Sequence, residues 1–434
     1  MTTDYQKNSI SLTGAVSMGT GVMIGAGIFA LTGQIAELAG TWFPLSFLVG
    51  AVVTFFSAYS YIKMSNAYPS AGGIAMILEK AYGPGVVAAS ASLLMAFSMV
   101  INESLVARTF GTYTLQLFGT ENTKLLVPVL GVGLIVFAFL VNISGNRSIG
   151  LFSLIMALLK IGGIALFGIA ALWASGLQFE PSKSEVDYPL AGFVASVALS
   201  ILAFKGFTTI TNSGAEIVDP HRNVGRAIVI SVSICVVVYL LVAFAVGSNL
   251  TIPEIIQAKD YSLAQAAKPA LGQAGFYLTI VLAIVATASG LLASVFAVSR
   301  MLAMLTNMKL IPHSHFGMAG RIQKHTLVYT VVVAALLTIF FDLSRIASLG
   351  VFFYLVMDIV IHWGVFRNLR HDIGARGSIL LSAISLDTIV LAVFVVMKIR
   401  TDMAIVVTAA VAIIAVFAFE YWFLSNRKIT SHER

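Results

Sequence analysis

Charged residues are scarce in this chain of 434 residues, because only 10% are Asp, Glu, Lys or Arg while 59% are hydrophobic. An ordinary soluble domain has roughly a quarter charged residues, so this composition excludes a soluble protein. The net charge of +7 would raise the question of a nucleic-acid partner in a soluble protein. Here the charges lie between apolar runs, so their distribution indicates how the chain is oriented in a membrane. No nucleic-acid partner is expected.

Cysteine and the common catalytic motifs are also missing. Cys235 is the single cysteine, so no internal disulfide can form. The chain contains no GxxxxGK[ST] loop, no HExxH motif and no Cys cluster, which argues against an ATP-driven pump or a zinc protease. His313 and His315 form an HSH sequence, but two ligands on a loop make a weak metal site. We expect no cofactor and no metal, and the missing nucleophile–base pattern argues against an enzyme.

Long apolar runs predict an all-α integral membrane protein with about twelve transmembrane helices. A spanning helix needs ~20 mostly apolar residues. Lipid offers no partner for open backbone, and no run alternates as a barrel strand does, so every span is expected to be helical. The expected spans are 14–38, 42–66, 85–118, 124–142, 148–175, 190–217, 224–248, 275–306, 326–342, 345–365, 378–398 and 402–424.

The basic residues predict the orientation of these spans. Of the 26 Lys and Arg residues, sixteen fall in the segments on the side of the two termini and seven on the other side. The remaining three, Arg108, Lys160 and Lys205, lie within spans. Lys and Arg are enriched in cytoplasmic loops, so both termini are expected in the cytoplasm, with the protein in a bacterial cytoplasmic (inner) membrane.

Two spans differ from the others near their centres. The first has four glycines within MGTGVMIGAGIF at 18–29, and the sixth contains AFKGF at 203–207. A glycine costs a helix interior about 1 kcal/mol relative to alanine, so such a cluster predicts local unwinding, although small residues also allow close helix packing. Because the two spans hold corresponding places in two five-helix halves, they indicate a transporter site formed between inverted repeats.

An unwound pair of helices can bind both ends of an amino acid. A break frees backbone N–H groups at the start of the following half-helix and carbonyls at the end of the preceding one. The N–H groups suit a carboxylate, and the carbonyls suit an ammonium group. The expected donors are Gly25, Ala26, Gly27 and Ile28, and the expected carbonyls lie around Met23, Ile24, Leu202, Ala203 and Phe204.

The run GTGVMIGAGIF resembles the Gly-rich first helix of the amino acid-polyamine-organocation (APC) permease superfamily. YPSAGG at 68–73, AFKGF followed by AEIVDPHRNVGRAI at 203–228, and SRMLAML…LIP at 299–312 agree, so the resemblance covers essentially the whole chain. It implies the leucine-transporter-type fold, with two inverted five-helix repeats, discontinuous helices 1 and 6, and two further helices. The implied parts are a tail 1–13, repeats 14–175 and 190–365, helices 11 and 12 at 378–424, and a tail 425–434.

The resemblance also implies a set of substrate contacts. Similar permeases place an aromatic that closes over the substrate where Phe204 stands. Phe204 and the many small residues favour a compact, fairly apolar pocket. Lys205 departs from the family, in which neutral residues are usual at this position. The implied backbone contacts are Gly25, Ala26, Gly27, Ala203, Phe204 and Gly206.

Ionisable residues inside the spans need an explanation, because a charge at mid-membrane costs roughly 2.5–3.5 kcal/mol on insertion scales. Lys160 lies near the centre of the fifth span, where a buried amine can gain and lose a proton during transport. Sodium-independent members of the family carry a lysine at what looks like the same place, standing in for a sodium ion. Lys160 is therefore a candidate for proton coupling or for a fixed sodium surrogate, with a structural ion pair as the alternative.

Other ionisable residues allow several roles. Lys205 could hold a substrate carboxylate, repel basic substrates, or pair with Glu103 or Asp358. Glu103 and the pair of Asp358 and His362, one helical turn apart, are candidates for a proton path. A packed hydrogen bond is the simpler interpretation of the Asp358–His362 pair. Asp387 lies outside the ten-helix core and is expected to make a packing or oligomer contact.

The sequence therefore predicts a secondary active transporter of small or medium neutral L-amino acids, independent of sodium, coupled to protons and working by alternating access. Thr287, Ser289 and Ser294 could ligate sodium, but an ammonium at Lys160 would compete for the same space. The alternatives are an exchanger or exporter of amino acids or amines, and a carrier of acidic amino acids that uses Lys205. No repeated filter segment favours a channel. The expected partners are an amino acid, the proton and the lipid bilayer, with no expectation for oligomeric state.

Overall fold

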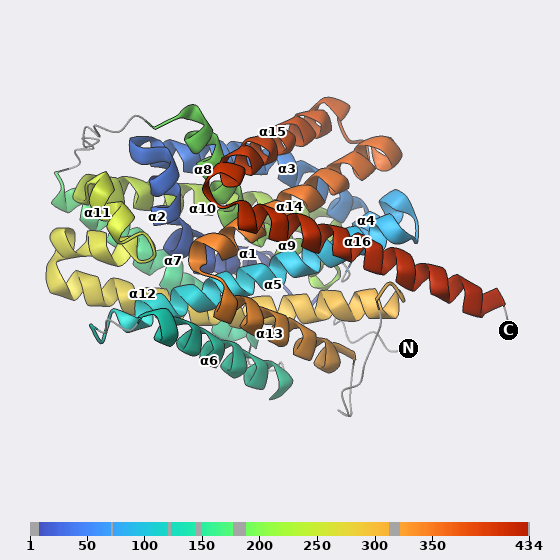
Figure 1. Cartoon of the computed structure of the whole chain (residues 1–434), viewed down its shortest axis with the longest axis horizontal. Helices are drawn as coiled ribbons and strands as arrows, with labels where there is room; N and C mark the ends of the chain where they lie inside the picture. Colours follow the sequence, from blue (N-terminus) through green and yellow to red (C-terminus); the bar gives the residue numbers. More distant parts are fainter. Residues whose placement is uncertain are drawn as a thin grey trace.

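The computed structural model describes residues 8–70, 73–119, 123–144, 149–176, 188–311 and 322–432, which are almost entirely helical (Figure 1). In these ranges, ten helical segments are long and apolar enough to cross a membrane, and two shorter apolar helices, Leu12–Gly25 and Lys324–Phe340, accompany them. The prediction of an all-α integral membrane protein is confirmed. His313 and His315 lie outside the described residues.

The helices follow the predicted spans along the chain. Those before residue 177 are α1 (Leu12–Val22), α2 (Ile28–Ala39), α3 (Phe43–Ala67), α4 (Gly73–Tyr82), α5 (Val86–Leu115), α6 (Thr123–Ser144) and α7 (Ile149–Ala174). Those after residue 187 are α8 (Leu190–Phe204), α9 (Thr208–Asn212), α10 (Pro220–Asn249), α11 (Ile252–Gln257), α12 (Ser262–Asn307), α13 (Ile322–Phe340), α14 (Leu343–Gly364), α15 (Gly377–Thr401) and α16 (Met403–His432).

Helix α12 begins well before the predicted start of its span at residue 275. It contains a kink at Gly272, whose φ of 69° lies in the left-handed region. Glycine adopts this conformation without the steric cost that a Cβ imposes. The span is therefore preceded by a short helical stretch that the apolar pattern alone does not reveal.

The two unusual spans are each interrupted near the middle. A π-helical turn, Met23–Gly27, joins α1 to α2, and a 3-10 turn, Lys205–Phe207, joins α8 to α9. The irregularity falls on the predicted glycine-rich stretches, but the chain stays helical through both turns. Single π-helical turns inside α-helices are rare and frequently occur at functional sites.

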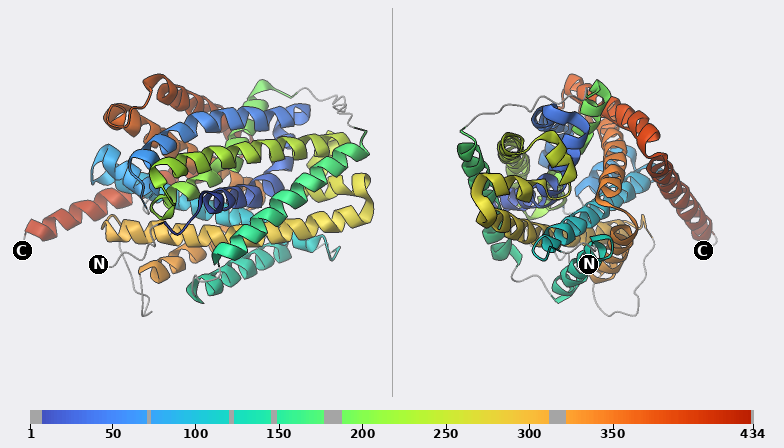
Figure 2. Two further views of the ribbon diagram at one scale, coloured as in Figure 1. Left: turned by 180° about the vertical axis from the view of Figure 1, so that it is seen from behind. Right: turned by 60° about the vertical axis from the view of Figure 1, so that its left-hand side comes forward.

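The helices run roughly along one axis, with the irregular turns inside the bundle (Figures 1 and 2). Helix α5 packs against α6, α12 and α14, while α10 packs against α3, α7 and α1. The start of α1 and the end of α16 lie at the same end of the bundle as α4, and α11 lies at the opposite end. Helix α16 lies at the outside of the bundle, with apolar side chains such as Val411 and Ile414 exposed to the surroundings.

Candidate functional site

The two interrupted turns contact each other through glycines. A Cβ built on Gly27 would lie 2.7 Å from the carbonyl oxygen of Ala203, and one built on Gly206 would lie 2.7 Å from the backbone nitrogen of Met23. Each glycine therefore gives the backbone of the opposite turn room to approach. Gly25 faces another direction, because its Cβ would lie 3.3 Å from the carbonyl oxygen of Ala286 in α12. Both sequence interpretations hold here, since the same stretches pack closely and interrupt the regular helix.

Tyr239 of α10 links the two turns. Its hydroxyl lies 2.6 Å from the carbonyl oxygen of Met23 and 3.1 Å from that of Ala203, and donates to both in one shared hydrogen bond. The ring of Phe204 packs on the Tyr239 ring with centroids 4.9 Å apart. In this conformation Tyr239 therefore bonds to two of the carbonyls predicted to be free, those of Met23 and Ala203. Sequence reasoning missed Tyr239, which stands in the apolar run CVVVYLLV without any local signal.

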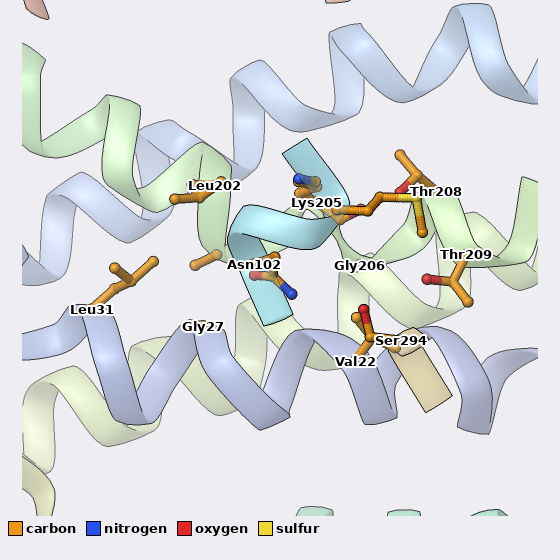
Figure 3. A pocket seen from close by; sticks show the side chains of 12 residues that line it. Val22, Gly27, Leu31, Asn102, Leu202, Lys205, Gly206, Thr208, Thr209 and Ser294 are labelled. Atoms are coloured by element: carbon orange, nitrogen blue, oxygen red, sulfur yellow. The ribbon is translucent and has the colours of Figure 1, made fainter. Parts of the chain in front are cut away.

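A small buried cavity lies beside these turns (Figure 3). The space open to the centres of water molecules is about 20 Å³, which is room for one or two waters and too little for an amino acid. The lining comes from α1 and α2, α5, α8 and α9 with their connecting turn, and α12. The lining residues are Val22, Gly27, Leu31, Met99, Asn102, Leu202, Ala203, Lys205, Gly206, Thr208, Thr209 and Ser294.

The lining of the cavity is mixed. Seven of its twelve residues are apolar or glycine, in keeping with the expected compact, fairly apolar pocket. The other five carry polar side chains, including Asn102 of α5 and the two threonines that open α9. Phe204 is not among the lining residues, because its buried ring is turned toward Tyr239. The helical period explains the difference, since Phe204 and Lys205 point in different directions from the same turn.

Lys205 forms part of the cavity wall and is held by α5. Its Nζ donates to the carbonyl oxygen of Ser98 at 2.6 Å and lies 2.5 Å from Ser98 Oγ. The ammonium group also lies 5.5 Å from the centroid of the Tyr354 ring, within the range of a cation–π contact. In the described part of the chain, Lys205 makes no ion pair with Glu103 or Asp358 within 4.0 Å, so the predicted pairing is not seen.

Glu103 lies next to the cavity on α5. Its Oε1 accepts a hydrogen bond of 3.4 Å from Ser294 of α12, while Oε2 has no hydrogen-bond partner in the described ranges. The side chain is completely buried. Glu103 thus brings a carboxyl group to the side of the cavity formed by α5 and α12.

Lys160 reaches the first interrupted helix from α7. The residue is 3% exposed, and its Nζ donates to the carbonyl oxygen of Gly21 at 3.1 Å. Gly21 lies in the last turn of α1, directly before the π-helical turn. Two hydroxyl groups of α12 were candidates for sodium ligands, but both donate hydrogen bonds within their own helix. Thr287 donates to the carbonyl oxygen of Ala283 at 2.6 Å, and Ser289 donates to that of Val285 at 2.8 Å.

Asp358 and His362 lie away from the cavity wall, on α14, in a cluster with Asp387 of α15. Asp358 accepts a hydrogen bond of 2.5 Å from Ser57 and another from the Tyr61 hydroxyl. Asp387 is 0% exposed within this single chain. Of the two expectations for Asp387, the packing contact agrees with this burial and the oligomer contact does not, because α15 packs on α3, α8 and α14 and turns this side chain inward.

An all-α membrane protein with two interrupted helices in contact around a buried cavity belongs to the class of membrane transport proteins. The family model described as Amino acid permease matches residues 10–426. The chain is 30% identical over 378 residues to the inner membrane transport protein YbaT of Escherichia coli, covering 86% of each chain. This chain belongs to the amino acid permease family.

Two further relatives are named for the amino acids that they transport. The serine/threonine exchanger SteT of Bacillus subtilis is 21% identical over 368 residues, covering 83% of each chain. The branched-chain amino acid permease BcaP of Lactococcus lactis is 24% identical over 367 residues, covering 77% of this chain and 76% of the relative. The chain is therefore an amino acid transporter that acts in a membrane.

Proposed function

We propose that this protein is a secondary active transporter of small or medium neutral L-amino acids, independent of sodium and coupled to protons. The observation that carries the proposal is the contact between the two interrupted turns, where the backbone of Gly27 and of Ala203 meets at a buried cavity. The names of the relatives SteT and BcaP, a serine/threonine exchanger and a branched-chain permease, support neutral amino acids as substrates. An exchange or export mode remains the second candidate, because a carrier runs in either direction along its gradients.

The substrate would bind between the two turns. The backbone at Gly25, Ala26 and Gly27 would receive the carboxylate, and the carbonyls of Met23 and Ala203 would receive the ammonium group after releasing Tyr239. The cavity is too small for an amino acid as it stands, so this conformation is closed. Binding therefore requires α1 and α2 to move relative to α8 and α9. Alternating access would consist of this movement, first toward one side of the membrane and then toward the other.

The proton would be carried by Lys160. Its ammonium group donates to Gly21 at the end of α1, so its charge is linked directly to the position of the helix that binds the substrate. Glu103 and Asp358 are secondary candidates for a proton path. Two five-helix repeats at 14–175 and 190–365 and both termini in the cytoplasm complete the proposal. The relative YbaT is an inner membrane transport protein, which supports an inner-membrane location.

Ligand-dependent stability tests the substrate class. The purified protein is heated with L-amino acids, their D-enantiomers, polyamines and nucleobases, each with and without sodium. A ligand at 100 times its dissociation constant adds about 2.7 kcal/mol of stability. We expect a shift with neutral L-amino acids that sodium does not change. A shift confined to polyamines would exclude the zwitterion site, and a shift with acidic amino acids alone would favour the carrier that uses Lys205.

Lys205 is expected to exclude basic substrates, because its ammonium group lines the cavity. Replacing it as Lys205→Met removes this charge, so arginine should bind about tenfold more tightly relative to a neutral amino acid, or about 1.4 kcal/mol. Binding is measured by competition against a radiolabelled neutral substrate. The variant Lys205→Arg keeps the charge and should keep the parent's discrimination. An unchanged ratio in Lys205→Met would remove Lys205 from the selectivity site.

A further inference from the structure

Three ionisable side chains meet in the interior at a distance from the cavity. Asp358 and His362 lie one turn apart on α14, and Asp387 faces them from α15. All three residues are 0% exposed. One ligand atom from each lies within 4.8 Å of the others. A buried group of two carboxylates and one imidazole is unusual, because charged side chains inside proteins are paired or coordinate metals.

The distances within this cluster are wrong for hydrogen bonds. His362 Nε2 lies 3.4 Å from Asp358 Oδ2 and 3.4 Å from Asp387 Oδ2, whereas protein N–H···O hydrogen bonds span about 2.7–3.2 Å. Two ligand atoms bound tetrahedrally at 2.0–2.2 Å from a zinc ion lie about 3.3–3.6 Å apart, from the same bond lengths. The separations therefore fit ligand atoms around a common ion, and they also lie within the range of an ion pair between a protonated imidazole and the two carboxylates.

Two of the three residues face one another with atoms that have no hydrogen-bond partner. His362 Nε2 and both carboxylate oxygens of Asp387 make no hydrogen bond in the described ranges. In the described chain, no Lys or Arg forms an ion pair with either carboxylate, so the neighbouring group that can carry a positive charge is His362 when protonated. Two ionised carboxylates and a neutral imidazole carry a charge of −2 in the low-dielectric interior, and a divalent cation neutralises it. The cation would lie between the unpartnered atoms of His362 and Asp387.

Hydroxyl groups hold two of these residues. Ser60 Oγ lies 2.7 Å from His362 Nδ1, on the far side of the imidazole ring from the carboxylates. Both oxygens of Asp358 accept a hydrogen bond: Oδ2, which faces His362, from Ser57 at 2.5 Å, and Oδ1 from Tyr61. Metal-binding histidines almost always use their second ring nitrogen in such a hydrogen bond, and ligating carboxylates are also hydrogen bonded. Helix α3 therefore orients His362 so that Nε2 faces the two carboxylates.

We propose that Asp358, His362 and Asp387 bind one divalent transition-metal ion, with zinc as the matching ion. One imidazole nitrogen and two carboxylate oxygens are ligands that Zn²⁺ accepts. The ion joins α14 to α15, and the serine contacts extend the link to α3. This site is separate from the cavity and does not depend on the proposed substrate. It ties α15, which follows the two repeats, to the helices of the repeats.

The competing explanation is a proton on Asp387, which also removes one negative charge. The two explanations differ in what Asp387→Asn does. Asparagine has the shape of the protonated acid, so a proton site keeps its stability in this variant. A metal site loses an anionic ligand and with it the bound ion. Glu420→Gln is the matched control, because Glu420 is likewise buried with both carboxylate oxygens unpartnered, but it lies on α16.

The experiment measures zinc in the purified full-length protein by mass spectrometry, after expression in zinc-supplemented medium and removal of loosely bound metal with a chelator. We expect about one zinc per chain in the parent and in Glu420→Gln, and at least a tenfold loss in Asp387→Asn. The variant Ser60→Ala, which keeps all three ligands, should reduce zinc retention 10- to 100-fold in competition with a chelator.

Melting curves provide the second readout. Zinc supplied during unfolding and refolding should raise the melting temperature of the parent and of Glu420→Gln, and leave that of Asp387→Asn unchanged. Absence of zinc from the parent would overturn the proposal. A parent-like melting temperature in Asp387→Asn would then favour a protonated carboxyl group, and a lower one would favour an ion pair with protonated His362. Failure of amino acid binding has no bearing on these readouts, so the two proposals fail independently.

Discussion

Replacing Gly27 with valine is expected to abolish amino acid binding. A Cβ at this position would lie 2.5 Å from Tyr239 Oη and 2.7 Å from the carbonyl oxygen of Ala203, and valine adds two methyl groups beyond it. The backbone carbonyl cannot rotate away, so the two interrupted helices must separate. Overpacking of this kind costs typically about 1–3 kcal/mol of stability. The carboxylate and ammonium contacts would then no longer fit one zwitterion, and the ligand-induced thermal shift should vanish.

Substitutions at two other glycines are compared with Gly27→Val, and Gly21→Ala is the control. A Cβ on Gly21 would lie 3.7 Å from Lys160 Nζ, an ordinary contact, so Gly21→Ala should bind substrate like the parent. Gly25→Val should also impair binding, but by pressing on Ala286 of α12 at the back of the turn. A folded Gly27→Val protein that shows the parent's thermal shift would exclude the site between the two turns.

The fold followed from the sequence because lipid leaves the backbone few choices. An apolar run of about 20 residues must be helical in a membrane, so the existence of the long helices could be predicted from composition alone. Details set by local backbone conformation could not. The kink at Gly272 and the short helix α11 (Ile252–Gln257) depend on turn geometry and packing, and hydropathy does not report either of them.

The candidate site was predictable where the signal is local. Glycines in the first and sixth spans marked the interrupted turns, because glycine is unfavourable in a helix unless its small size is needed. Tyr239 could not be found in this way, since its role arises only where α10 crosses both turns. The partner of Asp387 could not be found for the same reason: a packing contact was one of its two expected roles, but only the packing of α15 on α14 shows that it lies beside His362.

Three of the polar residues that line the cavity were not predicted, for a related reason. Asn102, Thr208 and Thr209 look unremarkable in the sequence, and threonine in particular is common where membrane helices pack. Which side of a helix faces the cavity depends on how the neighbouring helices are rotated, and no single sequence shows this. Lys205 could be identified because a charged residue within a span costs free energy of insertion and therefore needs an explanation. Neutral polar residues cost less and do not stand out in the sequence.

Replacing Lys160 with alanine is expected to remove the dependence of transport on a proton gradient. In the described conformation, its Nζ donates to the carbonyl oxygen of Gly21. A hydrogen bond from a charged group contributes about 1.5–3 kcal/mol, which corresponds to roughly a 10- to 150-fold shift between two conformations of α1. Loss of the proton would weaken this contact and release α1, so protonation and helix movement are coupled.

The measurement is amino acid uptake into proteoliposomes, with and without a pH gradient that is acid outside. The parent should accumulate substrate when the gradient is present, whereas Lys160→Ala should show equal uptake in both conditions and retain counterflow. Lys160→Arg separates the two roles of the cation, because arginine stays protonated in proteins. If Lys160 carries the proton, Lys160→Arg also loses the response to the gradient. If it acts only as a fixed substitute for sodium, Lys160→Arg keeps the parent's response, and the coupling proton must be sought at Glu103 or Asp358.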